Sequence, residues 1–406
     1  MHITRICSPL LALLFAIPAG NREEALDIVQ QIEFGKIESS FSCARSPDDR
    51  FLYVLRSIIS DNDVVDIYSI LPGGGQVRLR GSFLLTVELS IPKIAITHGG
   101  LHIYAIADKD VYVMDRDPAT GALDNLRSAT GGNTGGLNAS TFVLVSNDDR
   151  NVYVAGRNYE GFEGRVYVYE RAIPGGGLTF IEYASLEPNS EPEFVLEMAM
   201  SRNDKTLYVP SFSKHRLWVW RRAPANGGPD HGELTLLEVH DDDSVGGTAD
   251  GLRGAYGVSI SPDDRTLLVA GQDDNAIAVF SKQPSGRLTF HRAIFDDEPN
   301  LEGDQSSEAT GLEGARHVRF LNHRAVLVGS YRDQSASIFK FRSNLGTFEE
   351  LDVDQWSKIS FEFLTVTSGG ELAFAVFSSL NDTTPGALMV LLPRPGTNAF
   401  QGMLPH

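Results

Sequence analysis

The segment Ser261-Pro-Asp-Asp-Arg-Thr-Leu-Leu-Val269 is the clearest indication of the fold, because it joins a polar turn to an apolar, β-branched run and recurs along the chain. Its clearest relatives are Ser46-Pro-Asp-Asp-Arg-Phe-Leu-Tyr-Val54, Ser146-Asn-Asp-Asp-Arg-Asn-Val-Tyr-Val154 and Ser201-Arg-Asn-Asp-Lys-Thr-Leu-Tyr-Val209. A second apolar run follows each of them, such as Ile277-Ala-Val-Phe280. Short apolar runs separated by turn residues predict paired β-strands.

The pattern occurs seven times. One aromatic or leucine position marks its copies, at Tyr53, Tyr104, Tyr153, Tyr208, Leu268, Leu327 and Phe374. Successive markers lie roughly 50 to 60 residues apart, slightly longer than the usual unit of a β-propeller with four strands per blade. The sequence therefore predicts an all-β, seven-bladed β-propeller. No linker divides the repeats, so we expect one domain over residues 24–393 and a C-terminal tail over 394–406.

Each unit also contains an inner strand before the polar turn and an outer strand after the second run. Several outer strands begin with Gly-x-Leu-Thr, as at Gly176-Gly-Leu-Thr179 and Gly286-Arg-Leu-Thr289. Glycine suits a turn that needs positive φ. The last unit lacks an outer strand, and residues 25–34 supply a strand of that type. We therefore expect this N-terminal strand to complete the last blade and close the ring, which protects the sheet edges.

Residues 1–20 have the features of a secretory signal peptide. Arg5 precedes an apolar run over 10–17 and the small residues that follow Pro18. The run is too short to span a membrane. The alternative is an N-terminal extension of the fold. The signal predicts a secreted or periplasmic protein whose mature chain keeps only Cys43, without a disulfide, as a small buried apolar residue.

The formal net charge of −18 excludes several classes of partner. A chain this acidic repels nucleic acid and anionic membranes. The motifs of serine hydrolases, zinc proteases and phosphate-binding loops are absent. We therefore expect no nucleic acid, no membrane insertion, no metal and no cofactor, and the oligomeric state stays open.

Two recurring features are expected to have structural roles rather than to form a functional site. The aspartates of the Ser-x-Asp-Asp motif return in several blades, so we expect them to cap tight turns. The aromatic side chains at fixed repeat positions are expected to pack within and between blades, and these are Tyr53, Tyr104, Tyr153, Tyr208, Trp218 and Trp220.

Function is expected where the repeat is broken near the central axis. Aligning the inner strands on the turn gives one equivalent position in each blade, occupied by Ser42, Lys93, Phe142, Glu197, Gly257, His317 and Phe363. Charged side chains are unusual on such enclosed strands. Lys93, Glu197 and His317, with Arg316, could meet at the channel mouth and supply a base, an acid and cations. The alternative is ion pairing that only satisfies buried charge.

Two further groups are weaker candidates. Arg253 and Tyr256 lie where a glycine-rich loop enters an inner strand, so they could contact a ligand at the same mouth or simply anchor the loop. The acidic stretches over 240–243 and 296–304 carry oxygen ligands of the kind that calcium prefers, although neither has the EF-hand pattern. A solvated acidic rim explains them equally.

The complete unit resembles the lactonase-type seven-bladed propellers, a group that includes phosphogluconolactonase-like and muconate-cycloisomerase-like proteins and overlaps the Tyr-Val-Thr-Asn surface repeats. The resemblance covers residues 26–392. The segment Gly314-Ala-Arg-His-Val318 is similar to the Gly-Pro-Arg-His stretch of the lactonases, with Ala315 in place of proline. The turn at Leu321-Asn-His-Arg324 departs from the family pattern.

Two functions follow from these observations. The first is a secreted, lactonase-like binding module for a small molecule or protein at the channel face. The alternative is a lactone hydrolase or isomerase, in which His317 acts as general base or acid, Glu197 orients it, and Arg316 with Lys93 stabilises the oxyanion.

Overall fold

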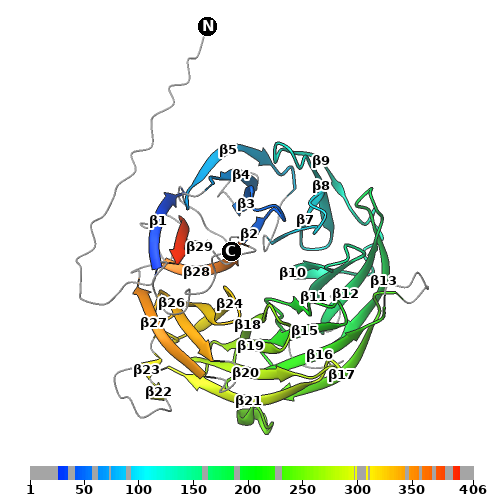
Figure 1. The fold of residues 1–406 in the computed structure, drawn as a ribbon. Helices are drawn as coiled ribbons and strands as arrows, with labels where there is room; N and C mark the ends of the chain where they lie inside the picture. Colours follow the sequence, from blue (N-terminus) through cyan, green and yellow to red (C-terminus); the bar gives the residue numbers. More distant parts are fainter. Residues whose placement is uncertain are drawn as a thin grey trace.

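A computed structural model confirms the propeller: seven four-stranded sheets, here called blades 1 to 7, surround a central axis (Figure 1). It describes residues 26–34, 42–56, 63–72, 75–87, 93–157, 163–186, 193–224, 231–296, 298–299, 308–309, 311–342, 347–355, 359–367, 372–379 and 387–393. The expected signal at 1–20 and the tail at 394–406 lie outside these residues.

Blades 1 to 3 use consecutive strands, and their bounds are β2 (Ser42–Arg45), β3 (Phe51–Arg56), β4 (Val64–Ile70) and β5 (Val77–Leu84); β6 (Ile94–Ile96), β7 (His102–Ile106), β8 (Val111–Arg116) and β9 (Leu123–Ser128); β10 (Asn138–Val145), β11 (Asn151–Arg157), β12 (Gly164–Arg171) and β13 (Leu178–Ser185).

Blades 4 to 6 follow the same plan, with β14 (Ala199–Met200), β15 (Thr206–Ser211), β16 (Arg216–Arg222) and β17 (Leu234–Asp241); β18 (Ala255–Ile260), β19 (Thr266–Gly271), β20 (Ala276–Lys282) and β21 (Leu288–Phe295); β24 (Ala315–Phe320), β25 (Ala325–Ser330), β26 (Ser335–Arg342) and β27 (Thr347–Gln355). A 3-10 helix, η1 (Asp243–Val245), and a two-stranded sheet of β22 (Glu298–Pro299) and β23 (Glu308–Ala309) lie in the connections.

Blade 7 contains strands from both ends of the described chain. Its order is β1 (Leu26–Glu33), β30 (Ala387–Pro393), β29 (Ala373–Ser379) and β28 (Ile359–Val366). β1 pairs antiparallel with β30, with Leu26 opposite Pro393 and Glu33 opposite Ala387. The first strand therefore lies outermost in the same sheet as the last three.

The inner strand of blade 4 is shorter than the sequence predicts. The apolar run predicts a strand over 195–200, but β14 begins only at Ala199. It pairs with β15 through just two residues, Ala199 and Met200. Glu197 therefore lies in the extended segment before the strand, where a side chain can leave the sheet pattern.

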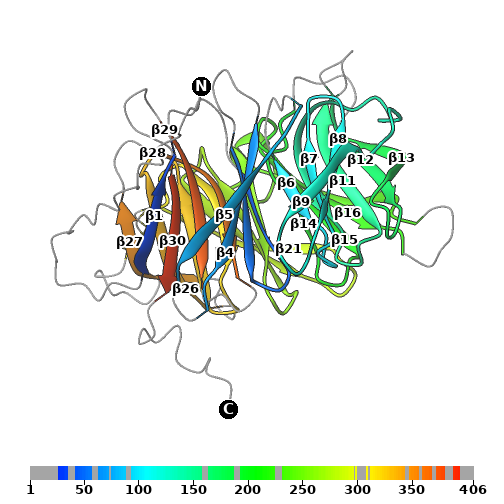
Figure 2. The ribbon, with the colours of Figure 1, turned by 90° about the horizontal axis from the view of Figure 1, so that it is seen from above.

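The strands run between two faces of the ring (Figure 2). We call the face where inner strands begin the start face; the connections from second to third strands lie there too. We call the opposite face, which carries the Ser-x-Asp-Asp turns between first and second strands, the turn face. Alternating apolar residues fill the space between blades, and each hydrophobic cluster joins neighbouring sheets. Cys43 is 2% exposed within such a cluster, as the sequence predicts.

Three of the repeated tyrosines connect neighbouring blades through hydrogen bonds, which confirms the structural assignment of these side chains. The hydroxyl groups of Tyr53, Tyr104 and Tyr153 donate to the carbonyl oxygens of Gly121, Gly176 and Gly232, each in the following blade. These glycines have φ values of 76°, 73° and 92°, which only glycine adopts readily. A side chain there would also collide with the preceding blade.

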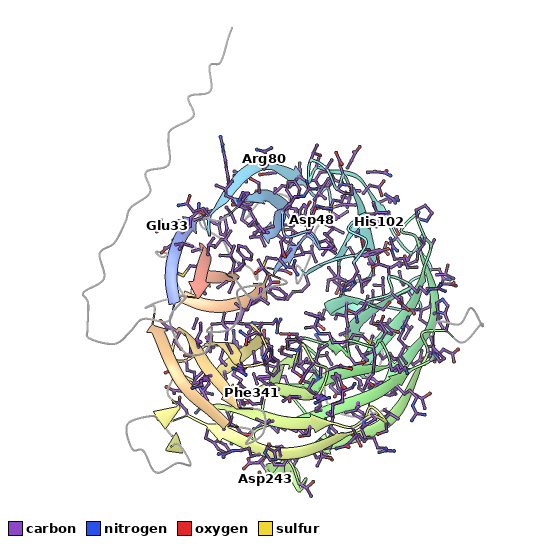
Figure 3. The ribbon with its side chains drawn as sticks, viewed as in Figure 1. Glu33, Asp48, Arg80, His102, Asp243 and Phe341 are labelled. Carbon is purple, nitrogen blue, oxygen red and sulfur yellow. The ribbon has the colours of Figure 1, made fainter. Side chains whose placement is uncertain are left out.

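The turn aspartates also have the structural role that the sequence predicts. Within a turn, Ser46 Oγ donates to Asp48 at 2.6 Å, and Ser146 repeats this contact with Asp148. The next aspartate reaches the preceding blade, since Asp149 accepts from the backbone N–H groups of His98 and Gly99, both at 2.6 Å. Figure 3 labels Asp48 at one such turn and His102 in blade 2.

Replacing Asp149 by alanine should therefore destabilise the contact between blades 2 and 3. Two charge-assisted hydrogen bonds disappear, and alanine must adopt a φ of 60°. We expect the free energy of unfolding to fall by about 2 kcal/mol, measured by urea denaturation. Asp149→Asn is the control, because asparagine tolerates positive φ and keeps one acceptor, so it should lose less. Equal losses in the two variants would contradict this account.

Candidate functional site

The inner strands and the segments just before them place a layer of side chains near the axis. We call the seven aligned positions the axial layer, and they are Ser42, Lys93, Phe142, Glu197, Gly257, His317 and Phe363. Several of them touch one another, as the alignment predicts. The ammonium of Lys93 lies 5.3 Å from the centre of the Phe363 ring, and that ring lies 6.1 Å from the imidazole of His317. The layer therefore joins residues of blades 2, 6 and 7.

Glu197 and His317 meet inside this layer. His317 Nδ1 lies 3.3 Å from Glu197 Oε2, although 120 residues separate them. Arg319 completes the group, because its Nη1 lies 2.5 Å from Glu197 Oε1. Arg319 also donates from Nε to the carbonyl oxygen of Leu364 in blade 7, at 3.1 Å. One carboxylate thus binds an imidazole and a guanidinium through different oxygens.

Gly257 makes this contact across blade 5 possible. A Cβ atom at this position would lie 2.3 Å from the carbonyl oxygen of Arg316 and 3.0 Å from His317 Cα. Only glycine lets the inner strands of blades 5 and 6 approach so closely. As a result, Glu197 of blade 4 contacts His317 of blade 6, because the axial-layer residue of blade 5, Gly257, has no side chain.

The electrostatic setting favours an ionised carboxylate and a neutral imidazole. Burial is the largest influence on Glu197 and raises its pKa, but the charge of Arg319 and the hydrogen bond from His317 bring that pKa below its ordinary value. Burial also dominates at His317, where it lowers the pKa; Glu197 opposes this, and Arg319 and Lys93 add to it. At neutral pH the pair is therefore Glu197 carboxylate and uncharged His317.

These protonation states determine which nitrogen can act as a base. A carboxylate can only accept hydrogen bonds, so Nδ1 of His317 must carry the proton that it donates to Glu197. Nε2 then holds the lone pair, which is the arrangement of a carboxylate-oriented general base. Both residues are 2% exposed, and the ring of Tyr256 contacts His317 edge-on at 5.2 Å. The pair is therefore almost inaccessible to solvent, and Tyr256 is one of the side chains that pack on it.

The other predicted residues lie around this pair. Arg316 does not join it, because its guanidinium points to the start face, where Nε donates to Gln272 Oε1 at 2.7 Å. Tyr256 stands between His317 and Phe212, so it contacts the pair directly. Arg253 is exposed on the preceding loop, and its backbone N–H donates to Asp274. Lys93 is buried in the axial layer, where its charge acts on His317.

The alignment missed Arg319, whose guanidinium takes the place expected for that of Arg316. The pairing register of β24 shifts between Ala315 and His317, so alternation is regular only after the shift. His317 and Arg319 are two residues apart and therefore face the same side. Counting forward from His317 in steps of two would have found Arg319.

Asp242, from the acidic stretch over 240–243, forms a cluster with two aspartates from other segments. The carboxylates of Asp242, Asp250 and Asp274 have oxygens within 4.8 Å of one another. Burial, followed by repulsion from Asp242, raises the pKa of Asp274 to about 6. Asp242 accepts from the backbone N–H groups of Ser244 and Leu252, so it also caps the loop around η1. In the other stretch, Glu302 and Asp304 lie outside the described residues.

Stability should fall with acidity because of two buried histidines. Burial lowers the pKa of His317 and of His102 below the ordinary value of 6.5. At His102 the nearby Arg171 acts in the same direction, with Nη2 2.8 Å from His102 Nδ1. The two histidines therefore bind protons more weakly in the folded protein than in the unfolded chain. As a result, the free energy of unfolding decreases as the pH falls through about 6.5.

Melting temperatures between pH 8 and pH 5 test this expectation. The wild-type Tm should be constant at the alkaline end and fall below about pH 6.5. A variant with both His102→Gln and His317→Gln should show a flatter profile over that range. An unchanged slope in this variant would assign the acid sensitivity to other groups.

Comparisons with known proteins show which proteins this chain resembles. No family model matches the chain. A 6-phosphogluconolactonase of Enterobacter sp. (strain 638) is 25% identical over 210 residues, which cover 51% of this chain and 52% of that protein. The chain thus spans about half the length of that relative.

Two solved structures share the fold. The periplasmic gluconolactonase PpgL of Pseudomonas aeruginosa superimposes with a TM-score of 0.57 at 17% identity, covering 77% of this chain and 85% of that one. A protein from Lactobacillus plantarum gives a TM-score of 0.55 at 16% identity, over 77% and 84% of the two chains. The chain is therefore similar to the lactonase-type seven-bladed propellers, as the sequence motifs indicate. Among the described residues, no helix is long and apolar enough to cross a membrane.

Proposed function

We propose that the protein hydrolyses a lactone at the start face, above the axial layer. The observation that carries this proposal is the buried contact of His317 Nδ1 with Glu197, which leaves Nε2 as a base. The similarity to a 6-phosphogluconolactonase and to a periplasmic gluconolactonase supports lactone chemistry over a purely binding role. It also supports a periplasmic or secreted location.

The proposed reaction assigns one role to each group. A water molecule attacks the lactone carbonyl carbon while His317 Nε2 takes its proton. Arg316 stabilises the negative charge that develops on the carbonyl oxygen. The bond between the carbonyl carbon and the ring oxygen then breaks, and His317 returns the proton to that oxygen. The product is an open-chain hydroxy acid, which releases one proton to neutral solution.

Glu197 and Arg319 act through His317 in this scheme. Glu197 holds the imidazole in the tautomer with the proton on Nδ1, and Arg319 keeps Glu197 ionised despite its burial. Because His317 is only 2% exposed, the reaction also needs side chains that pack on it, among them Tyr256, to move when the lactone binds. Tyr256 therefore belongs to the proposed site as a residue in contact with the base.

Proton release against a panel of sugar and aliphatic lactones tests the proposal. We expect the wild type to hydrolyse at least δ-gluconolactone or 6-phosphogluconolactone and His317→Ala to lose about 1,000-fold in kcat, as expected for loss of a general base. His102→Ala is the matched control, because His102 is also buried and neutral but lies on β7 of blade 2. Absence of turnover across the panel would overturn the proposal.

A binding propeller is the second candidate, and the burial of the pair favours it. Glu197 and His317 are each only 2% exposed, so an unaltered layer offers no base to a ligand. In that case Tyr256 and Arg316 at the start face would contact a small molecule or protein. Calorimetric titration with gluconate would then detect binding that His317→Ala leaves unchanged and Arg316→Ala weakens.

A further inference from the structure

Arg316 is held in one orientation by two neighbouring blades. Its guanidinium carbon lies 3.8 Å from the centre of the Tyr331 ring, in its own blade, and 5.4 Å from that of Tyr256 in blade 5. From blade 5, Gln272 accepts the hydrogen bond of its Nε at 2.7 Å. The side chain is half-buried, and Gln272 is 8% exposed.

These contacts constrain different motions of the guanidinium. Stacking on Tyr331 fixes the plane of the group, and the bond from Nε to Gln272 fixes its rotation within that plane. The backbone of Gln272 is itself anchored, since its N–H donates to the carbonyl oxygen of Gly254 at 3.1 Å. Together they determine where the two terminal nitrogens of Arg316 point.

Gln272 and Tyr331 occupy equivalent connections in blades 5 and 6. Gln272 directly follows β19 and Tyr331 directly follows β25, so each begins the link from the second to the third strand of its blade. Arg316 lies between these links, one residue before His317. The orientation of the Arg316 guanidinium therefore depends on the spacing between blades 5 and 6. Arg316 is also the direct neighbour of His317 in the sequence.

We propose that Gln272 and Tyr331 are positioning residues that aim Arg316 at the carbonyl oxygen of the bound lactone. The inference rests on the proposed lactonase function. A preorganised donor stabilises the oxyanion without reorganising during the reaction, so its misalignment lowers kcat more than it raises KM.

Steady-state hydrolysis of δ-gluconolactone and 6-phosphogluconolactone by the full chain is the test. Gln272→Leu removes the acceptor, and we expect kcat to fall about tenfold with KM changed less than about twofold. Gln272→Glu retains an acceptor for Nε and should keep kcat near the wild-type value. Tyr331→Phe keeps the stacking ring, whereas Tyr331→Leu removes it and should lower kcat in the same way.

A double variant separates positioning from a purely structural role. If Gln272 acts through Arg316, Gln272→Leu should lower kcat no further once Arg316→Ala is present. Full additivity, or unchanged kcat in Gln272→Leu, would overturn the inference while leaving the lactonase proposal intact. Absence of turnover by the wild type would instead overturn the proposed function, and the inference with it.

Discussion

Replacing Gly257 by alanine is expected to lower the free energy of unfolding by about 3 kcal/mol, because overpacking against rigid backbone has little means of relief. The new Cβ would lie 2.3 Å from the carbonyl oxygen of Arg316, so the inner strands of blades 5 and 6 must separate. That separation should also pull His317 away from Glu197. We therefore expect stability and lactone turnover to fall together.

Gly81 provides the matched control for this substitution. It lies on the outer strand β5, and a Cβ atom there would meet no atom within 4 Å. Gly81→Ala should change the urea midpoint very little. If Gly257→Ala unfolded at the same urea concentration as Gly81→Ala, the close approach of blades 5 and 6 would not be needed for the fold.

Replacing Glu197 by glutamine should produce the second large effect. The carboxylate is buried against Arg319 and His317, and removing one partner of a buried ion pair costs about 3 kcal/mol or more. The uncharged amide also no longer holds His317 in the required tautomer, so kcat should fall by about 1,000-fold or more. Urea denaturation and proton release measure the two effects on one preparation.

Glu163→Gln distinguishes loss of a buried charge from loss of the site. Glu163 is 8% exposed and pairs with Arg165 at 2.7 Å in blade 3, away from the axial layer. This variant should lose stability but keep its turnover. Glu197→Gln with wild-type kcat would exclude Glu197 from the chemistry and leave the pair with a structural role.

The fold could be predicted because the repeat is local. A Ser-x-Asp-Asp turn followed by a β-branched run determines a hairpin from neighbouring residues, and seven such units admit one ring. The same alignment brought Glu197 and His317 to one level, which their separation of 120 residues does not suggest. What the sequence predicted well was therefore the position of a residue within its blade.

Side-chain direction was less predictable where a strand departs from regular pairing. The register shift in β24 decides that Arg319 faces Glu197 while Arg316 turns to Gln272. The late start of β14 leaves Glu197 outside the strand. Both depend on contacts between blades, such as the approach at Gly257, and a single-blade pattern contains no information about them.

The pairing of β1 with β30 has a consequence for the time course of folding. Each of the first six blades forms from one continuous stretch of chain, so its contacts close short loops. Leu26 finds Pro393 only by closing a loop of nearly the whole described chain. Such distant contacts carry the largest entropic cost and form slowly. We therefore expect blade 7 to be the last sheet to acquire protection from hydrogen exchange during refolding.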